Sequence, residues 1–295
     1  AYLWENILVK ESLMDILYRF VHLQVEEYEF EGQTRKKEKL IFPRFHQLDV
    51  VRKITSDAKA NGAGKNYLIQ HSAGSGKSNS IAWLAYRLSS LHNQKDERVF
   101  DSVIVITDRR VLDQQLQNTI YQFEHKTGVV QKIDQDSTQL ADAIISGTHI
   151  IITTLQKFPF VIDKVGDIPN RKYAVIIDEA HSSQSGTAAG KMNQAMGVGQ
   201  NEEDEEDAQD KILKAMQARK MKGNASYLAF TATPKNATLE RFGTKQEDGT
   251  FKPFHLYSMK QAIEEGFILD VLANYTTYKS YYEIEKSIED NPLFD

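Results

Sequence analysis

The sequence predicts an α/β fold with a mainly parallel sheet covered by helices on both faces. Short apolar runs rich in β-branched residues alternate along the chain with segments whose apolar residues recur at helical spacing. The apolar runs are continuous, as expected for strands that are buried on both faces. Strands that alternate with helices are joined by right-handed crossovers, and these connections make the sheet parallel.

The elements can be assigned in order along the chain. Strands are expected at 66–71, 102–107, 149–152, 173–177, 226–230 and 271–278. Helices are expected at 5–25, 79–92, 110–124, 138–146 and 208–221. The basic stretch at 33–39 follows Gly32 and is interpreted as a linker, with a contact to DNA as the alternative.

A small-residue loop, 72–78, connects the first of these strands to a helix. Backbone N–H groups of such a loop and of the helix N-terminus together hold anionic phosphate oxygens. Gly74 and Gly76, with Ser75 between the two glycines, let the backbone close around phosphates. Lys77 would reach the β- and γ-phosphates. The Ser78 hydroxyl would be a ligand of Mg²⁺. The general pattern has Gly where this chain has His71, a departure that favours motor proteins over kinases or small GTPases.

Two acids follow the strand at 173–177, in the tetrad Asp-Glu-Ala-His. Ligands of open α/β sheets bind at the carboxyl ends of the strands, where these acids lie. Asp178 would hold Mg²⁺, and Glu179 would polarise the attacking water as a general base. His181 is expected to contact the loop of Thr231 and Thr233 and so couple the nucleotide to a DNA track. The alternative for the acids is the N-cap of a helix.

Hydroxyl, amide and charged groups also follow the strands at 102–107 and 149–152. Such groups are common donors to a phosphodiester backbone, whereas capping of the following helix is the alternative. The DNA-binding candidates are Asp108, Arg109, Arg110, Thr153, Thr154, Gln156 and Lys157.

These motifs, in this order, resemble the first RecA-like domain of a superfamily 2 helicase or translocase. The flanking sequences narrow the resemblance to the R (motor and nuclease) subunit of type I restriction enzymes. The stretches that carry it are 43–48, 71–78, 105–113, 177–184 and 262–270.

The resemblance implies a RecA-like phosphate-loop (P-loop) domain that uses ATP and Mg²⁺, with Gln47 recognising adenine. The alternative for Gln47 is an exposed glutamine on a helix. The implied partners are duplex DNA and the methyltransferase and specificity subunits of a restriction–modification complex. The nuclease residues, and a second RecA-like domain that supplies an arginine to the nucleotide, are expected outside this sequence. The sequence is therefore interpreted as an internal fragment with little activity alone.

Three segments are expected on that basis. Residues 1–40 would be a helical or linker segment from the end of an upstream nuclease domain. Residues 41–268 would form the first RecA-like ATPase domain, with an acidic insertion near 184–210. Residues 269–295 would lead into the second RecA-like domain.

Composition fits such a domain. Apolar residues make up 41% and charged residues 26% of the chain, which is ordinary for a globular protein. The absence of Cys excludes a disulfide framework and Cys-ligated metal, and no membrane segment or signal is expected, so a cytoplasmic location is predicted. The net charge is −5, but the acidic run 202–207 contributes six negative charges, which leaves 36 basic against 35 acidic residues elsewhere. Local basic patches must therefore carry any DNA contact.

The leading hypothesis is an ATP-hydrolysing DNA translocase lobe of a type I restriction endonuclease. One alternative is a stand-alone superfamily 2 helicase or a type III restriction motor with the same motifs. An alternative of another class is a nucleotide-binding switch or assembly module, which would not respond to duplex DNA.

Overall fold

The computed structural model describes residues 3–30, 33–107, 119–121, 128–133, 137–168, 170–178, 212 and 223–270. The insertion expected near 184–210, the strand expected at 271–278, and most of the helices expected at 110–124 and 208–221 lie outside the described residues. The described part of 110–124, residues 119–121, is helical.

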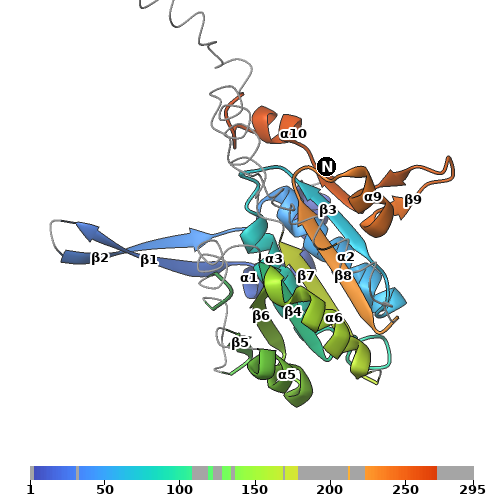
Figure 1. The fold of residues 1–295 in the computed structure, drawn as a ribbon. Helices are drawn as coiled ribbons and strands as arrows, with labels where there is room; N and C mark the ends of the chain where they lie inside the picture. The colour runs from blue at the N-terminus through green and yellow to red at the C-terminus, as the bar shows by residue number, and fades with distance from the viewer. Residues whose placement is uncertain are drawn as a thin grey trace, which may run out of the picture.

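A seven-stranded sheet lies at the centre of the molecule (Figure 1). Its strands, in spatial order, are β11 (His255–Tyr257), β3 (Tyr67–His71), β8 (Ala225–Thr231), β7 (Tyr173–Asp178), β4 (Ser102–Thr107), β6 (Ile150–Thr154) and β5 (Val130–Lys132). Every neighbouring pair of these strands runs parallel. The predicted parallel α/β sheet is therefore confirmed.

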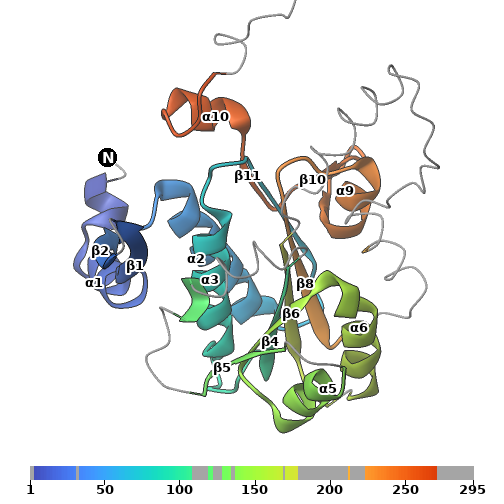
Figure 2. The same ribbon diagram turned by 60° about the vertical axis from the view of Figure 1, so that its left-hand side comes forward.

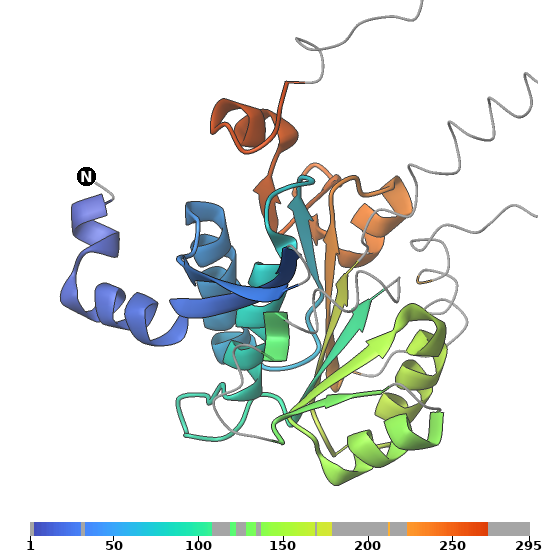
Figure 3. The same cartoon turned by 90° about the vertical axis from the view of Figure 1, so that its left-hand side faces the viewer.

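Helices cover both faces of this sheet, as Figures 2 and 3 show. On one face, α2 (Phe45–Asn61) and α3 (Lys77–Ser89) pack against Tyr67, Ile69 and other side chains of the strands. On the other face, α5 (Ser137–Ser146) and α6 (Phe158–Asp167) pack against the alternate side chains, such as Leu68. Successive side chains of a strand point to opposite faces, and this produces two separate apolar cores.

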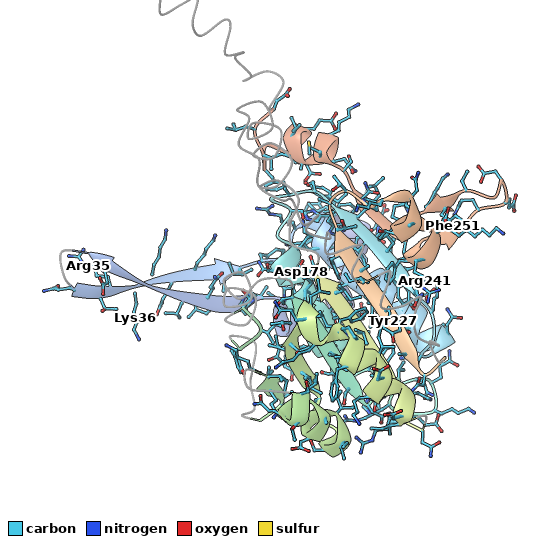
Figure 4. All side chains as sticks on the ribbon, viewed as in Figure 1. Arg35, Lys36, Asp178, Tyr227, Arg241 and Phe251 are labelled. Carbon is cyan, nitrogen blue, oxygen red and sulfur yellow. The ribbon has the colours of Figure 1, made fainter. Side chains whose placement is uncertain are left out.

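The amino-terminal segment differs from the sequence prediction. The helix expected at 5–25 is instead a π-helical turn, η1 (Leu3–Ile7), followed by α1 (Lys10–Arg19). From His22 onward the chain is extended as β1 (His22–Phe30), which pairs antiparallel along its whole length with β2 (Gln33–Ile41). The prediction of a helix to residue 25 was therefore wrong, because pairing within this hairpin satisfies the backbone of both segments. Residues 33–39, interpreted as a linker, belong to the second strand of the hairpin, and their role as a linker stays a prediction. The resulting ribbon projects away from the sheet, with Arg35 and Lys36 near its tip (Figures 1 and 4).

Helix α1 is docked on the body of the domain. Ile16 is fully buried in the same core as α2 and α3, as is Phe20, which directly follows the helix. The Asp15 carboxylate lies 2.8 Å from Arg87 Nη1 on α3 and 3.1 Å from Arg52 Nη2 on α2. Residues 10–20 therefore share a core with the ATPase domain that was expected to begin at residue 41.

The remaining described elements are short. They are η2 (Leu155–Lys157), α9 (Asn236–Phe242), the two-residue strands β9 (Thr244–Lys245) and β10 (Phe251–Lys252), and α10 (Met259–Glu264). Strand β11 returns the chain to the edge of the main sheet beside β3. Among the described residues, no helix has the length and apolar character needed to cross a bilayer.

Candidate nucleotide site

The predicted chemical groups meet at the carboxyl edge of three adjacent strands. Strand β8 lies between β3, which leads into the phosphate loop, and β7, which ends at Asp178. In the pairing register Gln70 lies opposite Thr231, and Asp178 lies opposite Phe230. The expectation that the strand at 226–230 neighbours the strand ending in Asp178 is thus confirmed. Figure 4 marks Asp178 on the ribbon.

The loop between β3 and α3 adopts the backbone geometry that its glycines permit. Gly74 has φ 71° and Gly76 has φ 74°, and both values lie in the left-handed region that side-chain-bearing residues rarely adopt. A Cβ at position 74 would come within 2.8 Å of Ile268 Cγ2, and one at position 76 within 2.5 Å of Gln47 Nε2. The left-handed backbone favours glycine at both positions, and a side chain at either would also have to displace Ile268 or Gln47.

Lys77 begins α3, and its side chain folds back over the loop. Its Nζ donates to the carbonyl oxygens of His71 at 3.3 Å and Ser72 at 3.2 Å. Burial lowers the pKa of Lys77 from its usual range, and the nearby negative charge of Asp178 opposes that shift. Lys77 and Asp178 thus interact electrostatically across the edge of the sheet.

Gln47, on α2, is only 2% exposed, which excludes an exposed helix glutamine. Its Oε1 accepts a hydrogen bond from the backbone N–H of Arg44 at 2.8 Å. Its Nε2 donates to the carbonyl oxygens of Ser75 at 3.3 Å and Gly76 at 3.0 Å. Gln47 therefore ties the start of α2 to the phosphate loop, and its contact with adenine stays a prediction.

Further residues support the loop and were not singled out from the sequence. Arg44 Nη1 donates to the Gly74 carbonyl at 3.2 Å, while its guanidinium lies 3.7 Å from the centre of the Phe267 ring. His46 Nε2 lies 2.8 Å from the Ser75 carbonyl oxygen. Arg44 and His46 both lie in the stretch 43–48, which carries the family resemblance. That stretch could have indicated them as site residues. Phe267 likewise lies in the stretch 262–270, which also carries the resemblance.

The loop fits the phosphates of a nucleotide. The hydroxyls of Ser72 and Ser75 are buried and have no hydrogen-bond partner among the residues that the structure describes. Backbone N–H groups of such a loop can donate to an anion, and α3 adds the positive end of its dipole. Ser78, partly exposed, and Asp178 supply oxygen atoms of the kind that Mg²⁺ prefers.

The predicted coupling residues are only partly within the described chain. Thr231 ends β8 and is 2% exposed, and its Oγ1 accepts a hydrogen bond from the backbone N–H of Thr233 at 3.3 Å. Thr233 is exposed. Glu179 and His181 lie outside the described residues, so their roles stay predictions.

The structure likewise describes only some of the DNA-binding candidates. Asp108, Arg109 and Arg110 lie outside the described residues. Thr154 ends β6 and Gln156 and Lys157 follow it, at the same edge of the sheet as Asp178. All three are partly or fully exposed. Thr153 is only 1% exposed, and we leave it out of the proposed contact.

The phosphate loop, Lys77 and the acid at the end of β7, on a parallel sheet covered on both faces, define a P-loop ATPase of the RecA-like class. Within that class, the chain belongs to the SWI2/SNF2 ATPase family, whose model matches residues 46–292.

Curated relatives extend the comparison. The chain is 26% identical over 303 residues to the "Putative type I restriction enzyme MjaVIIIP endonuclease subunit" of Methanocaldococcus jannaschii, covering 92% of this chain and 26% of that protein. It is 25% identical over 226 residues to the type I restriction enzyme EcoAI endonuclease subunit of Escherichia coli, covering 77% of this chain and 23% of that protein. The chain thus spans about a quarter of the length of these relatives.

One solved structure that the chain matches is a nuclease-deletion mutant of the Type ISP restriction–modification enzyme LlaGI in complex with a DNA substrate mimic. It gives a TM-score of 0.48 at 16% identity, over 86% of this chain and 23% of that one.

Proposed function

We propose that this chain is the first of two motor lobes of an ATP-dependent DNA translocase in the R subunit of a type I restriction endonuclease. The observation that carries the proposal is the arrangement of β3, β8 and β7. They place the phosphate loop, Thr231 and Asp178 side by side at one edge of the sheet. Membership of the SWI2/SNF2 ATPase family and the relatedness to two restriction endonuclease subunits support it.

In the proposed reaction, the loop N–H groups and Lys77 bind the β- and γ-phosphates of ATP. Ser78 and Asp178 would hold Mg²⁺, which when bound neutralises charge that develops on the phosphates. Glu179 orients a water molecule and accepts its proton. Gln47 would read the adenine base, as the resemblance implies. An arginine from a second RecA-like lobe would complete the site.

The proposed track is duplex DNA. It would contact Thr154, Gln156 and Lys157, together with residues 108–110, at the edge of the sheet that also carries Thr231. His181 and the loop of Thr231 and Thr233 would transmit the nucleotide state to this surface. The methyltransferase and specificity subunits of a restriction–modification complex are the proposed protein partners, and the cytoplasm is the proposed location.

The domain division is part of the proposal. Residues 41–268 form the first lobe, and residues 269–295 lead into the second. Segment 1–40 would connect to a nuclease domain, although residues 10–20 pack into the core of the first lobe. The chain by itself should bind ATP yet hydrolyse it slowly, because an arginine supplied to the transition state is worth about 10³–10⁵ in rate in related NTPases.

Nucleotide binding is tested by titrating Mg·ATP into the protein and its Lys77→Ala variant. Removal of the charge-assisted contact to phosphate should weaken binding at least tenfold. Lys164→Ala, a substitution on α6 outside the phosphate loop, is the control and should bind normally. Unchanged affinity in Lys77→Ala would exclude this loop as the nucleotide site.

The motor function is tested by adding duplex DNA to the complete protein. A translocase should hydrolyse ATP faster with DNA present, and the Lys77→Ala variant should abolish that stimulation. A rate that does not respond to DNA would instead support a nucleotide-binding switch.

A further inference from the structure

A chain of three side chains lies beneath the phosphate loop. His71 Nε2 lies 2.8 Å from His255 Nδ1, and His255 Nε2 lies 2.9 Å from Asp49 Oδ2. Asp49 also forms an ion pair with Lys53 at 2.7 Å. His71 is fully buried and His255 is 7% exposed. The three members come from β3, β11 and α2, so tertiary packing alone brings them together.

The chemistry of these groups fixes the direction of the hydrogen bonds. An ionised carboxylate only accepts, so His255 Nε2–H donates to Asp49. Burial lowers the pKa of His255 and lowers that of His71 to about 2, which keeps both rings neutral. The Nδ1 atom of neutral His255 then accepts from His71 Nε2–H. Asp49 thereby sets the tautomer and the orientation of both imidazoles.

His71 connects this chain of hydrogen bonds to the phosphate loop. It is the last residue of β3, and its carbonyl oxygen is one of the two that hold Lys77 Nζ. The next residue, Ser72, donates its backbone N–H to the Tyr257 carbonyl at 3.0 Å. An anchored His71 ring therefore fixes the backbone that positions Lys77.

Strand β11 supports the far side of the loop as well. The Tyr257 ring stacks on His46 with 3.7 Å between ring centres and an interplanar angle of 13°. His46 in turn contacts the Ser75 carbonyl oxygen. Strand β11, labelled in Figure 2, pairs with β3 and thus supports the loop at both of its ends.

We propose that His255 and Asp49 are positioning residues of the nucleotide site, which hold the His71 ring and with it the phosphate loop in the geometry that receives phosphate. The inference rests on the proposed nucleotide site. Neither residue belongs to the phosphate loop, so their effect passes through His71. Partners of this kind change ligand affinity about 10- to 100-fold in metal sites, and a change near the lower end is expected for a phosphate loop.

The test compares four variants of the complete protein by titration with Mg·ATP. His255→Phe keeps a ring of similar shape but removes both hydrogen bonds, and it should raise the Kd about tenfold. His255→Asn places an acceptor oxygen near the position of Nδ1 and should recover most of that loss. Asp49→Asn removes the charge that orients His255 and should also weaken binding.

Asp57→Asn is the matched control. Asp57 lies on the same helix and likewise pairs with a lysine and an aromatic side chain, Lys65 at 2.8 Å and Tyr67 at 2.7 Å. It lies outside the chain of hydrogen bonds to His71. Its loss should lower the melting temperature while leaving the Kd for Mg·ATP unchanged. If Asp57→Asn raises the Kd for Mg·ATP as much as Asp49→Asn does, the weaker binding comes from general destabilisation. That result would overturn the proposal.

The outcome for Lys77→Ala separates this inference from the proposed function. Weak binding by Lys77→Ala with normal binding by His255→Phe would overturn the positioning role alone. Normal binding by Lys77→Ala would remove the nucleotide site itself. ¹⁵N NMR of the imidazoles supplies a second readout: His71 should be neutral and protonated at Nε2, and the opposite tautomer would contradict the proposed direction of the hydrogen bonds.

Discussion

The Nε2 atom of Gln47 lies 3.0 Å from the carbonyl oxygen of Gly76, and this contact joins the start of α2 to the phosphate loop. The contact exists because Gly76 lacks a Cβ, which would come within 2.5 Å of that nitrogen. A motif glycine and a residue 29 positions upstream therefore depend on each other.

Gly76→Ala should remove most Mg·ATP binding, because the new methyl group displaces Gln47 and strains the left-handed backbone. The strain should lower the free energy of unfolding by about 1–3 kcal/mol. Gly62→Ala is the control for backbone strain, since Gly62 has φ 74° and ψ −158°, a region that essentially only glycine adopts, and has open space around its Cβ position. Titration and chemical denaturation of both variants check the prediction. Equal loss of binding in the two variants would show that strain alone is responsible.

Gln47→Ala should change the preference between ATP and GTP if Gln47 reads adenine. We expect the ATP affinity to fall about tenfold, as for loss of a buried hydrogen-bonding group, while the weaker GTP affinity changes little. Competition titrations with both nucleotides measure this. A parallel loss for ATP and GTP would mean that Gln47 only supports the loop, and no loss for either nucleotide would contradict both roles.

The core of the fold could be predicted from the sequence because its signals are local. The strands at 102–107 and 173–178 contain the continuous apolar runs 103–106 and 173–177, and each strand is buried along its whole length. The glycine loop and the acid of β7 could be assigned to one site because the carboxyl ends of parallel strands share an edge.

What could not be predicted depends on contacts that are distant in sequence. His255 lies 184 residues from His71, and β11 has only three residues, too few to show a periodic pattern. The helix expected at 5–25 was extended too far because Phe20 and Val21 continue the apolar spacing of α1. The chain turns instead at Phe20, where the Trp83 indole N–H donates to the Phe20 carbonyl at 2.9 Å.

Phe20→Ala should destabilise the domain, because Phe20 is fully buried and packs on Trp83 with 5.6 Å between ring centres. Large-to-small substitutions of this kind cost about 3–5 kcal/mol. Tyr18→Ala, which removes a ring that is 81% exposed, should cost under about 1 kcal/mol. Denaturant titration distinguishes the two variants. Equal stabilities would show that α1 contributes nothing to the domain and acts as a linker.

Acidification should destabilise the protein between pH 6.5 and 5. Burial lowers the pKa of His71 to about 2, and it also lowers the pKa of His22, His46 and His255 from the usual 6.5. The unfolded chain therefore binds protons that the folded chain does not, and stability is lost as the pH falls below 6.5. Each histidine that stays neutral contributes a slope of about 1.4 kcal/mol per pH unit once the pH is well below 6.5.

The contribution of His71 is measured with His71→Gln, which cannot titrate. The slope of the unfolding free energy against pH should become shallower. The change should not exceed the contribution of one bound proton. Asp49 and Asp57 have pKa values lowered from 3.8. They therefore affect the pH dependence of stability only at pH values below this range. An unchanged slope would mean that His71 is protonated in the folded state.

Coupling between ATP hydrolysis and movement is the central claim, and it is tested most directly by measuring ATP turnover and triplex displacement on the same DNA. The complete protein should displace the triplex only while it hydrolyses ATP. Replacing Thr231 and Thr233 together by Ala should leave ATP affinity near normal and allow hydrolysis to continue, but displacement per ATP should fall, because the link between the two sites is weakened. Proportional loss of both activities would contradict a coupling role for this loop, and hydrolysis without any displacement by the unmodified protein would contradict the motor itself.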